Sequence, residues 1–510
     1  MKRTTLSLIA VATALAAVTG FAALTAPDGS ATPEAKAPVT LPVERSSLLC
    51  PAPSTSEVAE TDYTSFTPAA QADTAEADPA AAKAEAGSKA ELKAASTAAT
   101  PGGATAKKPG AAKAPATVTQ PGKPVAAEAN GAAAPALTGS ATGNVAPGWT
   151  VQQTTVVPAG GARGLLGVTC TAPDTDFWFP AASTAKERQD YVHLTNPDDT
   201  AAVADIELYG PEGELKSQLT EGIPVPAHGS VPVLLSTLTG QTATADVTVH
   251  VTTRSGRVGA VVGAADDKLG SDWLPAAADP AGTAVLPGIP ADATSVRLVA
   301  YAPGEDDAEL KIQLVGETGT IVPASAQSLH VKSGMTAAVD LPDLTRGETG
   351  SLLLSPSDPK KSTSFVAALR VTRGKGDKQE VAFIPATAAI SARATVADNR
   401  SAGSTLALTA PGAAAEVKVT ASAGTGGGTP VSKTVTVKAG TTTKVADLVP
   451  AGLKGSYALT VERISGGPVH ASRTLAVPED GIPMFTVQTL VDDRGTVEVP
   501  TAKQDLTVLD

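Results

Sequence analysis

The stretch YVHLTNPDDTAAVADIELYGPEG, residues 191–213, decides the fold class. Apolar and polar residues alternate on both sides of a central Asn-Pro-Asp-Asp sequence, and a Pro-Glu-Gly turn closes the stretch. Alternation with a period of two predicts half-buried strands, and Asn, Pro, Asp and Gly favour the turn between them. The stretch is therefore a predicted pair of β-strands.

The same order of features occurs twice more, in SVRLVAYAPGEDDAELKIQLVGETG from Ser295 and in STLALTAPGAAAEVKVTASAGTGG from Ser404. A hydrophobic-Pro-small signature separates the copies, at Trp178–Ala181, Trp273–Ala276 and Phe383–Ala386. Its copies lie roughly 100 residues apart, which is the size of one β-sandwich. The repeat predicts an all-β chain of tandem immunoglobulin-like modules.

We expect three such modules, with an insert in the first. Residues 67–145 consist mostly of Ala, Lys, Pro, Thr, Glu and Gly, without an aromatic residue between Phe66 and Trp149. This composition buries too little apolar area to offset chain entropy, so it predicts a disordered insert, with a transient helix over 80–98. The modules are then expected at 46–66 plus 146–275, at 276–388 and at 389–510.

The two cysteines, Cys50 and Cys170, lie on either side of this insert. When a chain has only two cysteines, they usually form a disulfide in an oxidising compartment. Two thiols that are distant in sequence are too few to hold a metal ion. We expect a disulfide that places the segment around Cys50 beside Cys170, and two free thiols are the alternative.

The N-terminus has the pattern of an export segment. Lys2 and Arg3 precede an uncharged run from Leu6 to Ala26, as in Sec-type signals. The run is close to the roughly 20 residues that span a bilayer. Residues 1–26 are therefore expected to be a cleaved signal peptide or an uncleaved anchor, with the C-terminal part outside the cytoplasm. A buried core helix is the third alternative.

The charge balance excludes one class of partner. The chain has 39 Lys and Arg against 51 Asp and Glu, for a net charge of −12. Binding to nucleic acid needs a basic face that neutralises phosphates, so nucleic acid is not an expected partner.

A search for chemistry gives no catalytic, cofactor-binding or metal residues, and no cofactor is expected. The histidines are scattered, without a pair at the spacing of a zinc hydrolase, and no nucleophile elbow or phosphate-binding loop occurs. Asp198-Asp199 and Glu305–Asp307 occupy the same turn in two copies, and Asp266, Asp267 and Asp272 precede the second module. Calcium sites between modules use such carboxylates. Because the third copy has alanines at that turn, we interpret these acids as solvated turn residues.

Trp178 and Trp273 are the remaining candidates for a site. Both stand shortly before a proline at a module boundary. Exposed rings would suit stacking against a glycan, whereas recurrence at the boundaries favours packing between modules. We prefer packing.

Several short motifs together resemble a known family. These are Cys50-Pro51, Cys170 followed by the aromatic-Pro segment 177–180, and Asp-Trp-Leu-Pro at 272–275. In this combination the chain is similar to an uncharacterised family of exported actinobacterial proteins, known only as a domain of unknown function. The resemblance covers most of the chain beyond residue 45 apart from the insert. It implies an envelope location, and it supplies neither an activity nor site residues.

These observations lead to a hypothesis and two alternatives. The first is a non-enzymatic, exported cell-envelope protein whose β-modules bind a wall component or a protein partner, with the membrane contacted only through the N-terminal helix. The second is a structural spacer or accessory subunit of an envelope complex. The third is an enzyme with an unfamiliar site. A β-sandwich fold alone does not discriminate among them.

Overall fold

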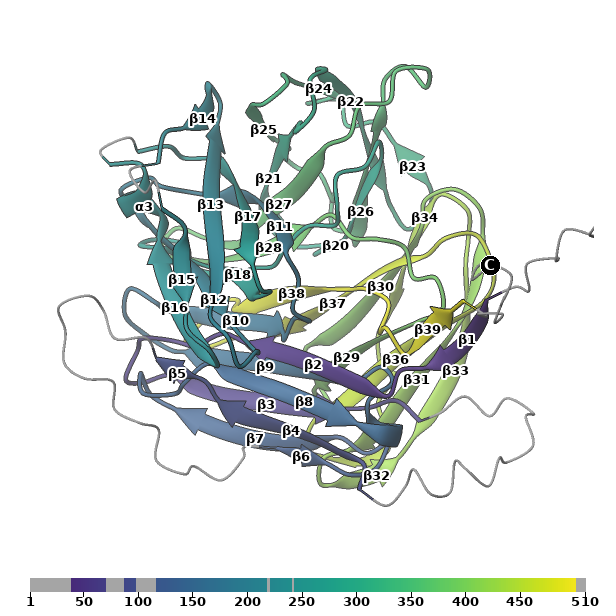
Figure 1. Ribbon diagram of the computed structural model, residues 1–510. Helices are drawn as coiled ribbons and strands as arrows, with labels where there is room; N and C mark the ends of the chain where they lie inside the picture. Colours follow the sequence, from purple (N-terminus) through teal and green to yellow (C-terminus); the bar gives the residue numbers. More distant parts are fainter. Residues whose placement is uncertain (1–37, 70–86, 98–115, 218–220, 241–242, 501–510) are drawn as a thin grey trace, which may run out of the picture. The chain divides into compact units, whose positions relative to one another are not determined.

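The computed structural model describes residues 38–69, 87–97, 116–217, 221–240 and 243–500 (Figure 1). In this part of the chain nearly all regular structure is strand, which confirms the predicted all-β class; the helical elements there are η1 (Gly143–Val145) and α3 (Leu235–Leu238). Residues 1–26, predicted to be an export segment, lie outside the described residues. Among the residues that the structure describes, no helix has both the length and the apolar character needed to cross a membrane.

The chain divides into two compact units. One of them contains β1 (Val39–Pro42) and β39 (Thr496–Val499), which pair as a two-stranded sheet. The other unit spans Pro42–Thr496 and contains eight larger sheets, which we describe as four sheet pairs.

The first sheet pair contains both cysteines. One sheet has the order β10-β9-β3-β7 and the other the order β2-β8-β4-β6. Residues of both sheets share one apolar core, in which Tyr63, Leu92 and Trp149 are the large side chains. Its strands are β2 (Arg45–Cys50), β3 (Glu60–Phe66), β4 (Lys89–Ala94), β6 (Thr117–Val118), β7 (Val125–Asn130), β8 (Leu137–Thr142), β9 (Thr150–Val157) and β10 (Gly164–Thr169).

The prediction of a disordered insert over 67–145 is therefore wrong for the described residues within it, where β4, β6, β7 and β8 lie in the first sheet pair. The transient helix expected over 80–98 is wrong for 89–94, which is strand β4. The segment supplies Leu92 and Leu137 to this core, and the aromatic side chains Tyr63 and Trp149 come from outside it. A Cβ at Gly139 would lie 2.5 Å from the ring of Trp149. Ala90 and Leu92 alternate with charged residues and are fully buried.

The second sheet pair follows the disulfide. Its sheets have the orders β11-β17-β13-β14, with β15 also on β13, and β19-β18-β12-β16-β5. Residues 46–66 and 146–275, expected to form one sandwich, are thus divided between the first and second pairs. The strands are β5 (Ser96–Thr97), β11 (Asp176–Ala182), β12 (Arg188–Thr195), β13 (Ala202–Gly210), β14 (Gly213–Leu215), β15 (Ile223–Val225), β16 (Gly229–Leu234), β17 (Val247–Ser255), β18 (Gly259–Asp266) and β19 (Gly270–Leu274).

The third sheet pair has the orders β20-β26-β22-β23, with β24 also on β22, and β25-β21-β27-β28. Its core contains Phe365 and Ile384. The strands are β20 (Ala284–Ile289), β21 (Ala293–Tyr301), β22 (Ala308–Val315), β23 (Thr320–Ile321), β24 (Ser328–Val331), β25 (Thr336–Asp340), β26 (Gly350–Pro356), β27 (Val366–Lys375) and β28 (Lys378–Pro385).

The fourth sheet pair has the orders β29-β36-β31-β32-β35, with β33 also on β31, and β34-β30-β37-β38. Its core is built from Val, Leu and Ala around Tyr457. The strands are β29 (Arg393–Asn399), β30 (Ser404–Ala410), β31 (Ala415–Gly424), β32 (Gly427–Thr429), β33 (Val431–Val437), β34 (Thr441–Val445), β35 (Ala451–Lys454), β36 (Tyr457–Gly466), β37 (His470–Ala476) and β38 (Phe485–Leu490).

The internal repeat reappears in the order of the strands. Strands β12, β21 and β30, which contain the starts of the three predicted copies, hold the same place in three equivalent sheets. Strands β13, β22 and β31 likewise hold one place in the three opposite sheets. The first strand of each pair (β11, β20 or β29) lies at the edge of that opposite sheet, beside β17, β26 or β36 respectively. In immunoglobulin domains, by contrast, the first and second strands share a sheet.

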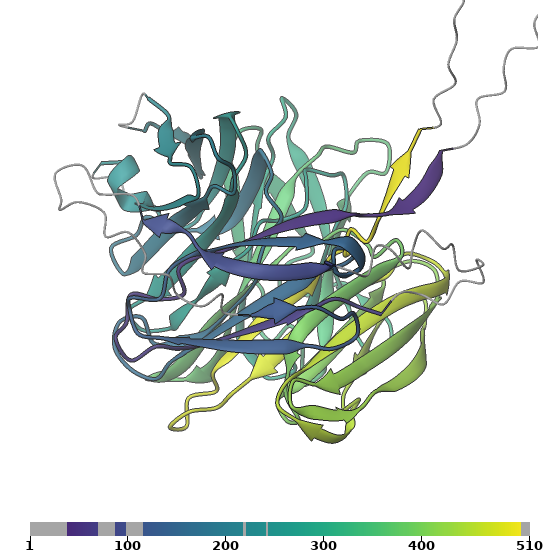
Figure 2. The same ribbon diagram turned by 60° about the horizontal axis from the view of Figure 1, so that its bottom comes forward.

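The four pairs contact one another in a closed cycle. Trp273 of the second pair packs with residues of the first, and Phe383 of the third pair belongs to the core of the second. Phe485 of the fourth pair belongs to the core of the third, and Phe66 of the first packs against Ala397 of the fourth. Figure 2 shows the two layers of the first pair (purple to blue) beside the strands of the fourth (light green to yellow).

Candidate functional site

Trp178 lies in a contact between sheet pairs. It stands on β11, is 7% exposed, and stacks on His250 with ring centroids 3.6 Å apart. It also stacks with Tyr301 of the third pair, with ring centroids 5.5 Å apart. Both ring nitrogens of His250 are within 3.2 Å of carboxylates, those of Asp176 and Glu207. The indole ring of Trp178 therefore packs against residues of the protein itself, as the packing interpretation predicts.

Trp273 is also buried, at 3% exposure. It packs with Val157, Leu166 and Val168 of the first sheet pair, and His193 meets it edge-on at 5.1 Å. Stacking on a glycan was conditional on an exposed ring, and neither tryptophan meets that condition.

The predicted disulfide between Cys50 and Cys170 is present. It joins the end of β2 to the residue after β10, and the two Cα atoms are 4.5 Å apart. Both sulfur atoms are buried in the core of the first sheet pair. Leu49 and Thr171, each adjacent to one of the cysteines, exchange backbone hydrogen bonds, so the disulfide lies next to a short antiparallel pairing. Its role is structural.

The acidic turns are occupied by partners within the chain. Arg257 donates two hydrogen bonds to Asp198, His228 pairs with Asp199, and Asp307 accepts the N–H of Ser333. In the part of the chain that the structure describes, acidic and His or Cys residues do not gather into a group of three or more able to hold a metal ion.

Asp272, another of the acidic residues considered as possible calcium ligands, lies in a buried polar junction where all four sheet pairs meet. Its Oδ1 accepts the N–H groups of Gly167 (2.9 Å) and Trp273 (2.8 Å), and the Thr486 hydroxyl donates to its Oδ2 at 2.9 Å. Burial raises the pKa of Asp272 well above its usual value, although these hydrogen bonds oppose the shift. A side chain at Gly167 would collide with Thr486 and Gln488.

Glu380 is the second buried carboxyl of the junction, and it comes from β28 of the third sheet pair. Its Oε1 accepts the N–H of Leu165 at 2.9 Å, whereas Oε2 has no hydrogen-bond partner. The nearest cation is Arg163, with Nη2 at 3.8 Å from Oε2. Burial raises the pKa of Glu380 to about 8, and the Leu165 hydrogen bond and the Arg163 charge only partly oppose it.

Arg163 connects three turns at the edge of this junction. It lies between β9 and β10, and its Nη2 donates to the carbonyl of Gln379 at 2.6 Å and to that of Lys268 at 3.4 Å. These carbonyls belong to the third and second sheet pairs. One guanidinium thus fixes the β9–β10, β18–β19 and β27–β28 turns relative to one another.

A depression of about 800 Å³ lies among these turns. Carboxylates dominate its charged lining, so it offers groups that attract cations. Its lining residues are Gly160, Arg163, Glu187, Asp266, Asp267, Lys268, Leu269, Gly376, Asp377 and Gln379.

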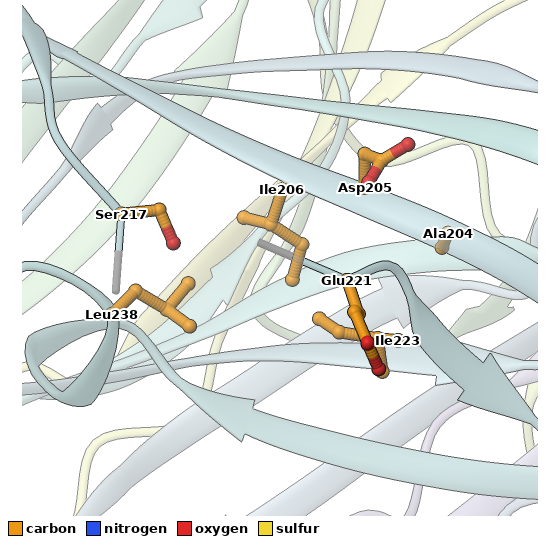
Figure 3. A pocket seen from close by; sticks show the side chains of 7 residues that line it. All are labelled: Ala204, Asp205, Ile206, Ser217, Glu221, Ile223 and Leu238. Carbon is orange, nitrogen blue, oxygen red and sulfur yellow. The ribbon is translucent and has the colours of Figure 1, made fainter. Parts of the chain in front are cut away.

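A second pocket, on the second sheet pair, is much smaller. Its volume is about 30 Å³, enough for one or two water molecules. Figure 3 shows the side chains of Ile206, Ile223 and Leu238 around it, together with Asp205. Asp205 is already bound by Arg254 at 2.6 and 2.8 Å, so this pocket offers no site for an organic ligand.

Sequence reasoning named Asp272 for a different role and missed Glu380 and Arg163. One local signal was available: Glu380 directly precedes the apolar run Val-Ala-Phe-Ile, so it stands where a strand enters the core. Most partners of these residues lie more than 100 positions away in sequence, and Glu380 and Leu165 are 215 positions apart. Such contacts leave no local pattern.

The chain belongs to a family of unknown function (DUF5719), whose sequence profile matches residues 125–447. The match begins at the first residue of β7, inside the segment that composition alone had assigned to disorder. No curated protein matches the chain.

Proposed function

We propose that this protein is a non-enzymatic, exported cell-envelope protein that binds a wall component or a protein partner through its β-sheet body. The observation that supports it most directly is the acidic depression at the meeting point of three sheet pairs. Ligand sites occur preferentially at such interfaces between domains.

Export is supported by the N-terminal sequence and by the disulfide. The basic residues followed by an uncharged run are the pattern of an export signal. A buried disulfide is compatible with an oxidising, extracytoplasmic compartment. We therefore place the described residues outside the cytoplasm, either secreted or tethered to the membrane by residues 1–26.

The sheet pairs are proposed to be tandem β-sandwich modules of the immunoglobulin-like type. Three of them repeat one strand order, and each pair encloses its own core. The first strand lies in the opposite sheet from that of an immunoglobulin domain, so the likeness is one of architecture.

Co-sedimentation of the purified full chain with isolated cell-wall material tests the proposal. Saturable binding that one wall polymer competes away, or stable retention of one envelope protein, is the expected result. Robust hydrolase activity in the purified chain would contradict it and favour the enzyme alternative.

An accessory subunit of an envelope complex is the second candidate. The burial of Trp178 and Trp273 between sheet pairs favours it, because these aromatic residues serve the cohesion of the body instead of a ligand. An accessory subunit would show no affinity for wall material but one defined protein neighbour on crosslinking.

A further inference from the structure

We propose that the two-stranded sheet of β1 and β39 is a self-association surface, on which β39 pairs with β39 of a second copy of the chain. The product is a four-stranded antiparallel sheet in the order β1-β39-β39-β1. Self-association of this kind goes beyond the proposed function and does not depend on it.

The register of β1 against β39 follows from the strand bounds and one hydrogen bond. The N–H of Val43, directly after β1, donates to the carbonyl of Gly495, directly before β39, at 3.1 Å. The strands therefore run antiparallel, and continuing the pairing sets Leu41 opposite Val497. Opposite residues share a face of the sheet, so four aliphatic side chains, each between 39% and 48% exposed, lie on one face. They are Val39, Leu41, Val497 and Val499.

Two strands make an incomplete sheet. In the part of the chain that the structure describes, β1 and β39 pair only with each other, and every residue of both strands is exposed. An isolated pair of strands is marginally stable at best, whereas three or more strands with an apolar face can be stable. A further strand beside β1 or β39 would therefore stabilise this sheet.

The two outer edges differ in the groups that they offer. Main-chain groups of successive residues in an antiparallel strand alternate between the paired side and the open side. Because Val497 is hydrogen-bonded toward Leu41, the N–H and C=O groups of Thr496 and Glu498 point to the open edge of β39. On β1 the outward positions include Pro42, which has no N–H, and proline is typical of a protected edge. The edge that can accept another strand is therefore that of β39.

A second copy of β39 complements this edge. Antiparallel pairing about a two-fold axis at Val497 sets Thr496 of each copy opposite Glu498 of the other, so each outward N–H and C=O of the strand meets a partner. The two carboxylates are then not opposite each other, which avoids the like-charge repulsion of a register centred on Glu498. Val497 of each copy also lies opposite its symmetry mate, so the two apolar faces become one continuous face.

The contact is too small for a permanent dimer. β39 contributes four residues from each copy, whereas stable interfaces use roughly 20–30 residues a side. Association is therefore reversible, and a covalent trap is the appropriate measurement.

Cysteine crosslinking of the full chain tests the pairing. Residues on the two-fold axis form a pair without mutual hydrogen bonds, with Cα atoms about 4.5 Å apart, a distance that a disulfide can span. Under mild oxidation V497C should form at least about ten times more disulfide-linked dimer than V499C, whose position faces Gly495 of the second copy. The native cysteines are already paired and do not compete.

Proline variants in the V497C background separate strand pairing from general adhesion. E498P removes an outward N–H of β39 without touching the pairing to β1, and it should lower the yield of dimer at least about fivefold. T40P makes the same change at the outer edge of β1 and should leave the yield unchanged. E498Q keeps the N–H and should also leave it unchanged, and thermal unfolding at the wild-type temperature confirms that each variant is folded.

Equal crosslinking of V497C and V499C would overturn the inference, because it would show random collision. So would the absence of a V497C dimer at about 0.1 mM protein, or a V497C dimer that E498P leaves intact. If purified V497C stays monomeric but is crosslinked to a different protein in a cell extract, the edge binds a foreign strand, and pairing with a second copy is refuted.

Discussion

Replacing Glu380 by Gln should make the protein less sensitive to alkaline pH. Glu380 is fully buried, and its pKa rises from 4.5 to about 8 on folding because burial disfavours the carboxylate. The folded state therefore keeps a proton that the unfolded chain has released. The stability that results is complete below pH 4.5 and disappears as the pH rises through 8.

Linkage converts this shift into a free energy. With a pKa of about 8 in the folded state and 4.5 in the unfolded state, raising the pH from 6 to 9 lowers the free energy of unfolding by about 3 kcal/mol. Gln cannot ionise, and it keeps an oxygen for the N–H of Leu165. Between pH 6 and pH 9, E380Q should therefore gain about 3 kcal/mol of stability relative to the wild type.

Urea unfolding at pH 6, 7, 8 and 9, followed by tryptophan fluorescence with the disulfide intact, measures this difference. Some slope will remain in E380Q, because the pKa of Asp272 is raised in the same direction. The exposed residue Glu305 supplies the control E305Q, which should follow the wild-type curve. Parallel pH curves for wild type and E380Q would refute the reasoning, because they would mean that Glu380 ionises in the folded protein at its ordinary pKa.

Three further predictions concern other parts of the chain. Limited proteolysis between β4 and β6 should leave two fragments joined by Cys50 and Cys170 on a non-reducing gel and separated by reductant, and reduction should destabilise the intact chain by about 4 kcal/mol in urea unfolding. His470 is buried and donates to the carbonyl of Thr387, and burial lowers its pKa to about 4. The stability that it contributes above pH 6.5 is therefore lost as the pH falls. In the same assay, H470Q should lose about 2 kcal/mol less free energy of unfolding than the wild type between pH 7 and 5. G167A should cost about 1–3 kcal/mol, because its methyl group would meet Thr486 and Gln488, whereas the same change at the open position Gly412 should cost less than about 1 kcal/mol in thermal unfolding.

The sequence was most informative where strands alternate strictly. The run Val247–Thr253 became β17, and Lys433–Lys438 overlaps β33, because each places apolar side chains on one face of a sheet. The common order of three copies then fixed which strands are equivalent. The partners of each strand could not be predicted in the same way, and β11 pairs with β17 where an immunoglobulin domain would place its first strand in the other sheet.

Composition misled the prediction in the first sheet pair. A segment rich in Ala and Gly was taken as unable to form a core, which holds only if it must supply the core alone. Here Tyr63 and Trp149 come from outside the segment, and Leu92, Leu137 and the small residues of β4 and β8 pack around them. One signal could have corrected the prediction. Charged and apolar residues alternate from Lys89 to Lys93, which is typical of a strand, although the composition of this stretch also suits a helix.

The candidate site was even less accessible to sequence reasoning, because it exists only where the sheet pairs meet. Arg163 and Lys268 lie on turns of the first and second pairs, and Gln379 stands at the start of β28 in the third. The guanidinium of Arg163 joins them through backbone carbonyls that any residue could supply. An isolated module would keep its own core but would lack two walls of the depression. A function located there therefore depends on the contacts among the sheet pairs, which Trp178 and Trp273 help to form.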